Sequence, residues 1–341
     1  LAEKGRGLVS PNPMVGAVLV HEGRIIGEGW HRRWGEAHAE VNCLLSVRPA
    51  DRALLPHSTL YCSLEPCSHV GKTPPCADLL IREKIGRVVV SNTDPNPQVA
   101  GKGLSRLRAA GIEVLTGVLE AEGRWLNRAF FTWMQQQRPH IILKWAQSRD
   151  GYLARPAERT PITGPLAQRL VHRWRGEADA ILVGTRTALT DNPRLDTRLF
   201  SGKNPLRVTI DRSGLLPAAH HLLDGSMPTW VYGQARPRPD ASPHPPVFKP
   251  LGAGLALPEL LSDLAQGRRA ILLVEGGADL LGQFLAADLW DELRVLENPA
   301  LYLGAGVAAP ALPAAAQLRE RLLVGADEVR IFSAGQGATR D

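Results

Sequence analysis

The strongest candidates for catalytic or metal-binding residues are His38, Glu40, Cys67 and Cys76. One imidazole and two thiolates are good ligands for a tetrahedral Zn²⁺, and three protein ligands leave the fourth position open, as in catalytic rather than structural sites. Zinc lowers the pKa of a water at that position to about 7. A carboxylate at position 40 can take a proton from the water and pass it to a leaving amine. The four residues therefore indicate a zinc-assisted hydrolysis that releases an amine.

A zinc ion that only holds a loop together is the main alternative, because it would use the same histidine and cysteines. The order His-x-Glu, then Pro-Cys, then a second Cys is typical of zinc nucleobase deaminases. The sequence departs from the short form of that pattern, since eight residues rather than two separate Cys67 from Cys76. A structural zinc site has no use for Glu40, so the catalytic interpretation is favoured.

Longer motifs extend this pattern: Ser10-Pro-Asn-Pro-Met-Val-Gly16, the segment from His31 to Glu40, Leu64-Glu-Pro-Cys-Ser-His69, Lys72-Thr-Pro-Pro-Cys76 and Asp94-Pro-Asn-Pro-Gln-Val-Ala-Gly101. Together they resemble the bifunctional deaminase–reductase of riboflavin biosynthesis, over essentially the whole chain. The resemblance implies zinc-dependent deamination of 2,5-diamino-6-(5-phosphoribosylamino)pyrimidin-4(3H)-one. It also implies NADPH-dependent reduction of the ribose of 5-amino-6-(5-phosphoribosylamino)uracil to ribityl.

The resemblance also implies a set of binding residues. In the deaminase half, the pyrimidine ribose phosphate would contact Asn12, His31, His69, Lys72, Asp94 and Asn96. In the reductase half, NADPH would contact Ala146, Pro161, Thr187, Asp191, Arg212 and Gly277. The substrate of that half would contact Arg159, Arg175, Leu195, Arg198 and Glu275. Taken alone, these residues have ordinary alternatives, such as turn positions for the asparagines, surface histidines, and solvated lysine and arginine side chains.

Hydrophobic periodicity predicts alternating strands and helices in the first half. We expect strands at residues 14–20, 24–30, 58–63, 87–91 and 113–116, and helices at residues 36–47, 76–84, 104–110 and 120–137. The helix at residues 36–47 would place His38 and Glu40 in its first turn, where the positive end of the helix dipole suits a carboxylate. This half is predicted to be a cytidine-deaminase-like α/β/α domain.

A polar break at residues 135–139 predicts a domain boundary, with a deaminase domain at 1–137 and a reductase domain at 138–341. We expect strands at residues 141–146, 180–184, 206–211 and 270–274, helices ending near Arg175 and Ala287, and a loop or edge connection at residues 236–250. A dinucleotide fingerprint G-x-G-x-x-G is absent, but Glu275-Gly-Gly277 ends a strand at a helix start, where backbone N–H groups can hold a pyrophosphate. The alternative for this Gly-Gly pair is a tight turn.

The resemblance implies a dihydrofolate-reductase-like α/β domain for this half. Pro161, Arg159 and residues 296–304 depart from the commonest family version.

Composition sets broader limits. The chain of 341 residues has a net charge of +6 and 44% hydrophobic residues, as expected for a two-domain enzyme that binds anionic ligands. It has neither a lysine-rich tail nor an apolar run long enough for a membrane span, so we expect no nucleic acid and no membrane partner. The chain has four cysteines, and two of them are expected to bind zinc as thiolates. This favours a reducing compartment, the cytoplasm, over a disulfide-bonded protein. We expect a homo-oligomer, and because residues 1–5 are typical of the end of a helix, we expect the natural chain to begin earlier.

Overall fold

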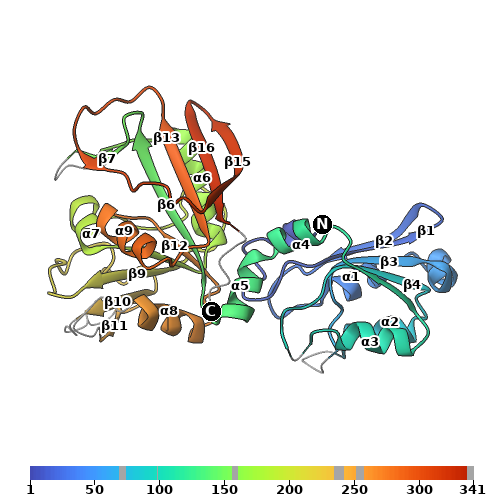
Figure 1. Ribbon diagram of the computed structural model, residues 1–341. Coiled ribbons are helices and arrows are strands. Elements are labelled where there is room, and N and C mark those ends of the chain that lie inside the picture. The colour runs from blue at the N-terminus through green and yellow to red at the C-terminus, as the bar shows by residue number, and fades with distance from the viewer. Residues whose placement is uncertain (69–73, 98, 156–159, 234–241, 251–256, 336–341) are drawn as a thin grey trace. The chain divides into compact units, whose positions relative to one another are not determined.

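The computed structural model describes residues 1–68, 74–97, 99–155, 160–233, 242–250 and 257–335 (Figure 1). The chain separates into two compact units, residues 1–138 and residues 139–341. Each unit is built on its own β-sheet, and the sequence patterns explain how each sheet is covered.

The N-terminal unit contains, in chain order, η1 (Ala2–Gly5), β1 (Gly16–His21), β2 (Arg24–Trp30), α1 (Ala39–Leu45), η2 (Pro49–His57), β3 (Thr59–Leu64), α2 (Cys76–Arg82), β4 (Arg87–Asn92), α3 (Lys102–Ala109), β5 (Glu113–Thr116), α4 (Glu120–Leu126) and α5 (Arg128–Gln136). Its described strands form a sheet in the order β2-β1-β3-β4-β5. β1 is antiparallel to β2 and β3, whereas β3, β4 and β5 run parallel.

Alternation along β3 fixes which face of this sheet is covered. Leu60 and Cys62 are buried, whereas Tyr61 between them is 44% exposed, because successive side chains in a strand point to opposite faces. The buried face packs against α1, α2 and α3 through a core that includes Cys43, Leu80 and Leu107. These three helices begin near the sheet end that carries the histidine and cysteine ligands predicted from the sequence.

The C-terminal unit contains β6 (His140–Ser148), β7 (Tyr152–Ala154), α6 (Pro165–Glu177), β8 (Ala180–Val183), α7 (Thr185–Asp191), β9 (Leu206–Asp211), β10 (Thr229–Gly233), β11 (Val247–Lys249), α8 (Leu257–Gln266), β12 (Ile271–Val274), α9 (Ala278–Ala286), β13 (Glu292–Asn298), β14 (Val307–Ala308), β15 (Ala316–Val324) and β16 (Asp327–Ala334). Its main sheet has the order β11-β10-β9-β8-β12-β6-β13-β16-β15 among the described residues. The strands from β11 to β13 are parallel, and β16 and β15 add an antiparallel edge.

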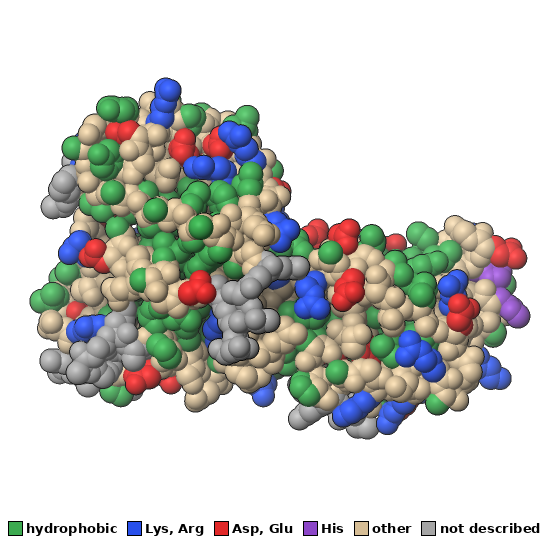
Figure 2. Space-filling view, viewed as in Figure 1, with side chains coloured by type: hydrophobic (Ala, Val, Ile, Leu, Met, Phe, Trp, Pro, Cys, Tyr) green, Lys and Arg blue, Asp and Glu red, His purple; other side chains and the backbone are tan. Residues whose placement is uncertain are grey.

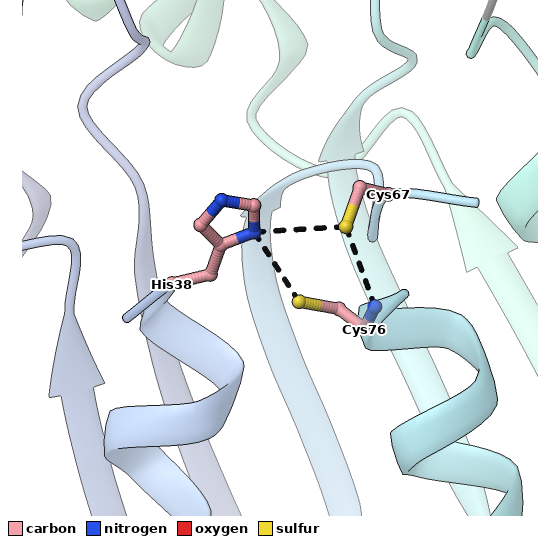
Figure 3. Close-up of side chains that lie close together, drawn as sticks. All are labelled: His38, Cys67 and Cys76. Atoms are coloured by element: carbon pink, nitrogen blue, oxygen red, sulfur yellow. Dashed lines mark hydrogen bonds between the residues drawn. The ribbon is translucent and has the colours of Figure 1, made fainter. Parts of the chain in front are cut away.

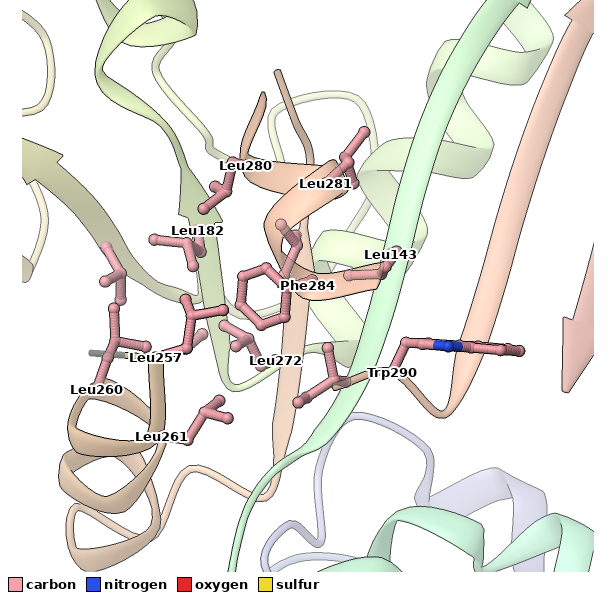
Figure 4. Packing of buried hydrophobic residues seen from close by; sticks show 14 of the residues in the cluster. Leu143, Leu182, Leu257, Leu260, Leu261, Leu272, Leu280, Leu281, Phe284 and Trp290 are labelled. Carbon is pink, nitrogen blue, oxygen red and sulfur yellow. The ribbon is translucent and has the colours of Figure 1, made fainter. Parts of the chain in front are cut away.

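The parallel strands of this sheet are apolar on both faces, as expected when helices cover both sides. On one face, Leu143, Leu182 and Leu272 pack with leucines of α8 and with Phe284 of α9 (Figure 4). On the other face, a second core contains side chains of α6 and α7 together with Ile181. The α/β architecture predicted for both halves is confirmed.

Two predicted helices differ from the structure. The expected helix at residues 120–137 is two helices, because Asn127 interrupts it to hydrogen-bond the backbone of Met14 through both its amide nitrogen, at 2.9 Å, and its amide oxygen, at 2.8 Å. The expected helix at residues 36–47 begins only at Ala39. The carbonyl of Ala37 is instead bound by the side chains of His31 and Asn42, which hold residue 37 outside the helix.

Candidate functional site

His38, Cys67 and Cys76 meet at one end of the five-stranded sheet (Figure 3). His38 is the N-cap residue of α1, Cys67 follows β3, and Cys76 is the first residue of α2. Their ligand atoms all lie within 4.8 Å of one another. Each ligand comes from a strand or helix terminus that packs on the same core, so the frame is set by the fold.

The distances in this frame suit zinc. His38 Nδ1 lies 3.6 Å from Cys67 Sγ and 3.4 Å from Cys76 Sγ. A tetrahedral zinc with ordinary Zn–N and Zn–S bonds would separate nitrogen from sulfur by about 3.6 Å. Hydrogen bonds from Cys76, and then from His38, hold the pKa of the Cys67 thiol well below its usual range. The donor set and its spacing therefore fit a zinc ion.

Glu40 is the second residue of α1 and is only 3% exposed. Burial raises the pKa of its carboxyl group, against an opposing effect of His38. A carboxyl group within hydrogen-bond reach of a metal-bound water can take up and return its proton. Glu40 therefore has the position expected of a proton carrier beside the His38 ligand.

Buried His31 and half-buried Asn12 form a pair next to the metal ligands. The His31 ring lies 5.5 Å from the His38 ring, edge to face. Its Nδ1 lies 3.1 Å from the carbonyl oxygen of Ala37 and its Nε2 lies 3.2 Å from Nδ2 of Asn12. A carbonyl can only accept, so Nδ1 carries the proton and Nε2 accepts from the Asn12 amide. Burial lowers the pKa of His31, which favours this neutral form.

The other predicted deaminase positions lie after β4 or in the loop between the cysteines. Asp94 Oδ1 accepts a hydrogen bond from the Asn96 backbone at 2.8 Å, which orders the turn that carries both residues. His69 and Lys72 lie outside the described residues. The structure thus brings Asn12 and His31 to the metal ligands and places Asp94 and Asn96 in a turn at the carboxyl end of a neighbouring strand.

The C-terminal unit contains a cavity of about 1080 Å³ at the carboxyl ends of β8, β9 and β12. In parallel α/β sheets this is where ligands bind. The described reductase positions predicted from the sequence all line it, namely Ala146, Pro161, Thr187, Asp191, Arg212, Gly277, Arg175, Leu195, Arg198 and Glu275. Arg159 lies outside the described residues. The volume is large enough for a dinucleotide and a second ligand together.

A buried charge cluster lies at the base of this cavity. Arg175 donates from Nε to Glu275 Oε1 at 2.7 Å and from Nη2 to Oε2 at 2.8 Å, while its Nη1 donates to the carbonyl of Asp196 at 3.2 Å. Lys144 Nζ lies 3.7 Å from Glu275 Oε2. Burial acts to raise the pKa of Glu275, but Arg175 and Lys144 outweigh it and lower that pKa to about 2. Glu275 therefore stays ionised at neutral pH.

The Gly276-Gly277 pair brings backbone close to α7. Gly276 has φ of +99°, a region that side chains with a Cβ rarely adopt, and a Cβ on Gly277 would lie 2.7 Å from Thr187 Oγ1. The Gly276 carbonyl accepts a hydrogen bond from Gly184 at 3.0 Å. Only glycines leave this stretch open, and the open backbone at the start of α9 fits a phosphate group of NADPH.

Comparison with known proteins agrees with these two sites. Residues 1–92 match the cytidine and deoxycytidylate deaminase zinc-binding region, and residues 139–335 match the RibD C-terminal domain. The riboflavin biosynthesis protein RibD of Aquifex aeolicus is 40% identical, over 90% of this chain and 86% of its own. The chain belongs to the RibD family. The family resemblance predicted from the motifs is confirmed.

Further relatives span the same length. The RibD of Escherichia coli is 39% identical, over 88% of this chain and 85% of its own. A crystal structure of a diaminohydroxyphosphoribosylaminopyrimidine deaminase/5-amino-6-(5-phosphoribosylamino)uracil reductase from Thermotoga maritima has a TM-score of 0.87 and 34% identity, and the match covers 98% of this chain and 95% of that one. As a RibD protein, this chain is a bifunctional enzyme of riboflavin biosynthesis with a zinc-dependent deaminase domain and an NADPH-dependent reductase domain.

Sequence reasoning missed several residues that bear on these sites. Lys144 and His172 line the reductase cavity, and burial lowers the pKa of both side chains. The signal for Lys144 was present, since a lysine interrupts an otherwise apolar strand. Asn127 fixes the backbone of Met14, two residues from Asn12, and its signal was hidden inside a helical pattern.

Proposed function

We propose that this RibD protein deaminates diaminohydroxyphosphoribosylaminopyrimidine within residues 1–137 and then reduces the ribose of 5-amino-6-(5-phosphoribosylamino)uracil with NADPH within residues 138–341. The observation that carries the proposal is the frame of His38, Cys67 and Cys76 beside a buried glutamate, since this set suits hydrolytic removal of an amine. The cavity of the C-terminal unit, with its arginines and its glycine pair, supports the second step.

In the deaminase domain, we assign the zinc to His38, Cys67 and Cys76. When bound, zinc acts as a Lewis acid that lowers the pKa of a water. Glu40 accepts a proton on its carboxylate and delivers it to the departing amine, so one buried carboxyl group serves as base and then as acid. Asn12 donates one amide proton to His31 Nε2, and its amide oxygen is the atom assigned to the substrate amine. His69, Lys72, Asp94 and Asn96 are assigned to the remainder of the pyrimidine ribose phosphate.

In the reductase domain, NADPH supplies the hydride, and we assign its binding to Ala146, Pro161, Thr187, Asp191, Arg212 and Gly277. The substrate is assigned to Arg159, Arg175, Leu195, Arg198 and Glu275. The guanidinium of Arg175 is already held by Glu275, whereas the Arg198 side chain is half exposed and forms an ion pair with Asp196. We therefore assign the ribose phosphate chiefly to Arg198 and give Arg175 the task of holding Glu275 in place.

The remaining properties concern partners and location. Figure 2 shows lysine and arginine side chains mixed with acidic ones over the face in view, with no basic stripe of the kind that follows a nucleic acid backbone. Among the described residues, the helices are too short or too polar to cross a bilayer. We propose that the protein binds no nucleic acid, forms a homo-oligomer, and works in the cytoplasm, where Cys67 and Cys76 stay reduced.

Product analysis tests the proposed function. The pyrimidine substrate is incubated with the zinc-loaded protein, with and without NADPH, and products are identified by mass. We expect the deaminated uracil and ammonia without NADPH, and the ribityl product only with NADPH. Deamination of a tRNA but not of the free pyrimidine would favour a nucleic acid deaminase and overturn the assignment.

A further inference from the structure

Glu65 joins the metal-ligand segment to the loop that follows β4. It comes directly after Leu64, the last residue of β3, and two residues before Cys67. Its backbone N–H donates to the carbonyl of Asn92 at the end of β4, at 2.9 Å. Its side chain is buried, with only 4% of the residue exposed. A buried carboxylate requires compensating hydrogen bonds, so the hydrogen-bond donors around Glu65 indicate its role.

Both oxygens of Glu65 are bound by backbone N–H groups of one segment. Oε2 accepts from Asp94 at 3.2 Å and from Gly101 at 2.9 Å. Oε1 accepts from Gly103 at 3.0 Å and from Leu104 at 3.3 Å. The carboxylate therefore binds the loop both at Asp94, near its start, and at residues 101–104, where α3 begins.

The segment also packs directly on the backbone next to Cys67. A Cβ on Gly103 would lie only 2.0 Å from the Pro66 carbonyl oxygen, so this helix start and the metal-ligand segment are in close contact. Gly101, the N-cap residue of α3, has φ of +72°, which a glycine adopts without strain. Because Glu65 takes up the first N–H groups of α3, the phosphate of a substrate has to be held by side chains of the loop rather than by this helix terminus.

We infer that Glu65 is a positioning residue of the deaminase: it sets the place of Asp94 and Asn96 relative to Cys67 without itself contacting the substrate. This inference rests on the proposed deaminase function. One of the four hydrogen bonds fixes residue 94 directly, and residue 96 is fixed through the turn that Asp94 forms with Asn96. The other three fix the far end of the same loop. A shift of the loop would move the groups that hold the ribose phosphate away from the metal site, while the metal ligands and Glu40 stay in place.

The test is Glu65→Gln in the full-length, zinc-loaded enzyme. A glutamine offers one carbonyl oxygen and turns an NH₂ group toward the other pair of N–H donors, so half of the contacts are lost. We expect the KM for pyrimidine deamination to rise about tenfold or more. We expect kcat to change by less than about threefold, because the proton carrier is untouched. Zinc content by elemental analysis and the kinetics of reduction of a pre-deaminated substrate should match the wild type.

The matched control is Glu83→Gln, an equal change of charge in the same unit. The Glu83 carboxylate lies 3.6 Å from Arg52 and 3.9 Å from Arg82, and both of these partners are outside the loop. This variant should leave the deamination KM unaltered. Should Glu65→Gln fail to fold, Glu65→Asp carries the same test, because it keeps both oxygens but draws them back by one methylene, and its KM should rise several-fold with zinc retained.

Three outcomes overturn the inference. They are an unchanged KM in Glu65→Gln or in Glu65→Asp, a fall in kcat with KM constant, and loss of zinc together with activity. The last would mean that Glu65 only supports the metal ligands. Failure of the proposed function looks different, since the wild-type enzyme itself would then release no ammonia from the pyrimidine.

Discussion

Replacing Arg175 by methionine should destabilise the C-terminal unit much more than the same change at Arg173, two positions earlier on α6. The Arg175 guanidinium is bound by both oxygens of Glu275 and has only 13% of its side chain exposed, and the Glu275 side chain is 7% exposed. Methionine would leave this buried carboxylate with Lys144, at 3.7 Å, as its remaining cationic partner among the described residues. Removing one partner of a buried ion pair costs about 3–5 kcal/mol, because the remaining charge is left uncompensated.

Arg173 provides the matched control. It also donates to a glutamate, Glu177, at 2.8 Å, but 51% of its side chain is exposed. An exposed pair of this spacing contributes only about 0.3–0.5 kcal/mol. The assay is urea unfolding of the full chain followed by tryptophan fluorescence, with hydrogen exchange in β6 and β12 to assign the transition to this unit. Equal costs for Arg175→Met and Arg173→Met would refute the reasoning, whereas adding Glu275→Gln to Arg175→Met should recover part of the loss.

Three further predictions follow from the two sites. Cys67→Ala and Cys76→Ala should each lose zinc and ammonia release, while Cys62→Ala, a buried non-ligand, should keep both; elemental analysis and an ammonia assay decide this. Arg198→Ala should raise the KM of the reduction substrate about tenfold and leave the KM for NADPH nearly constant, and a rise confined to NADPH would reverse the assignment. Because the pKa of Glu275 is about 2 in the folded chain and 4.5 ordinarily, its stabilisation is complete above the ordinary value and is lost as pH falls toward 2. Unfolding curves at several acidic pH values should show that loss in the wild type and not in Glu275→Gln.

The sequence predicted most where short-range pattern controls structure. Strands at residues 113–116 and 206–211 have the predicted bounds: Val114 and Leu115 mark the first, and in the second Leu206, Val208 and Ile210 alternate with polar residues. β13 was missed because Glu292 and Arg294 break its apolar pattern, yet both are buried and paired with each other at 2.6 Å. β15 was missed because most of its residues are exposed and charged residues interrupt its apolar ones, so no period marks it as a strand. Long-range pairing, and not local preference, makes both of these segments strands.

The candidate sites divide in the same way. The metal ligands were recognisable because His38, Cys67 and Cys76 are part of the motifs themselves, and the structure brings the three side chains together. The role of Glu65 was invisible, because its partners are backbone N–H groups of a segment that is brought beside it only by the pairing of β3 with β4. Lys144 could not be assigned for the same reason, because its partner Glu275 is distant in sequence and comes close only when the sheet is assembled.

The measurement that tests the central claim most directly is the rate of ammonia release by Glu40→Gln. The variant keeps His38, Cys67 and Cys76, so it should bind zinc like the wild type. Loss of the proton carrier should lower the deamination rate at least about a hundredfold. Reduction of a pre-deaminated substrate with NADPH should continue at the wild-type rate, because that chemistry belongs to the other unit. Ammonia release near the wild-type rate, from a variant that holds its zinc, would contradict the assignment of Glu40 and with it the proposed deaminase site.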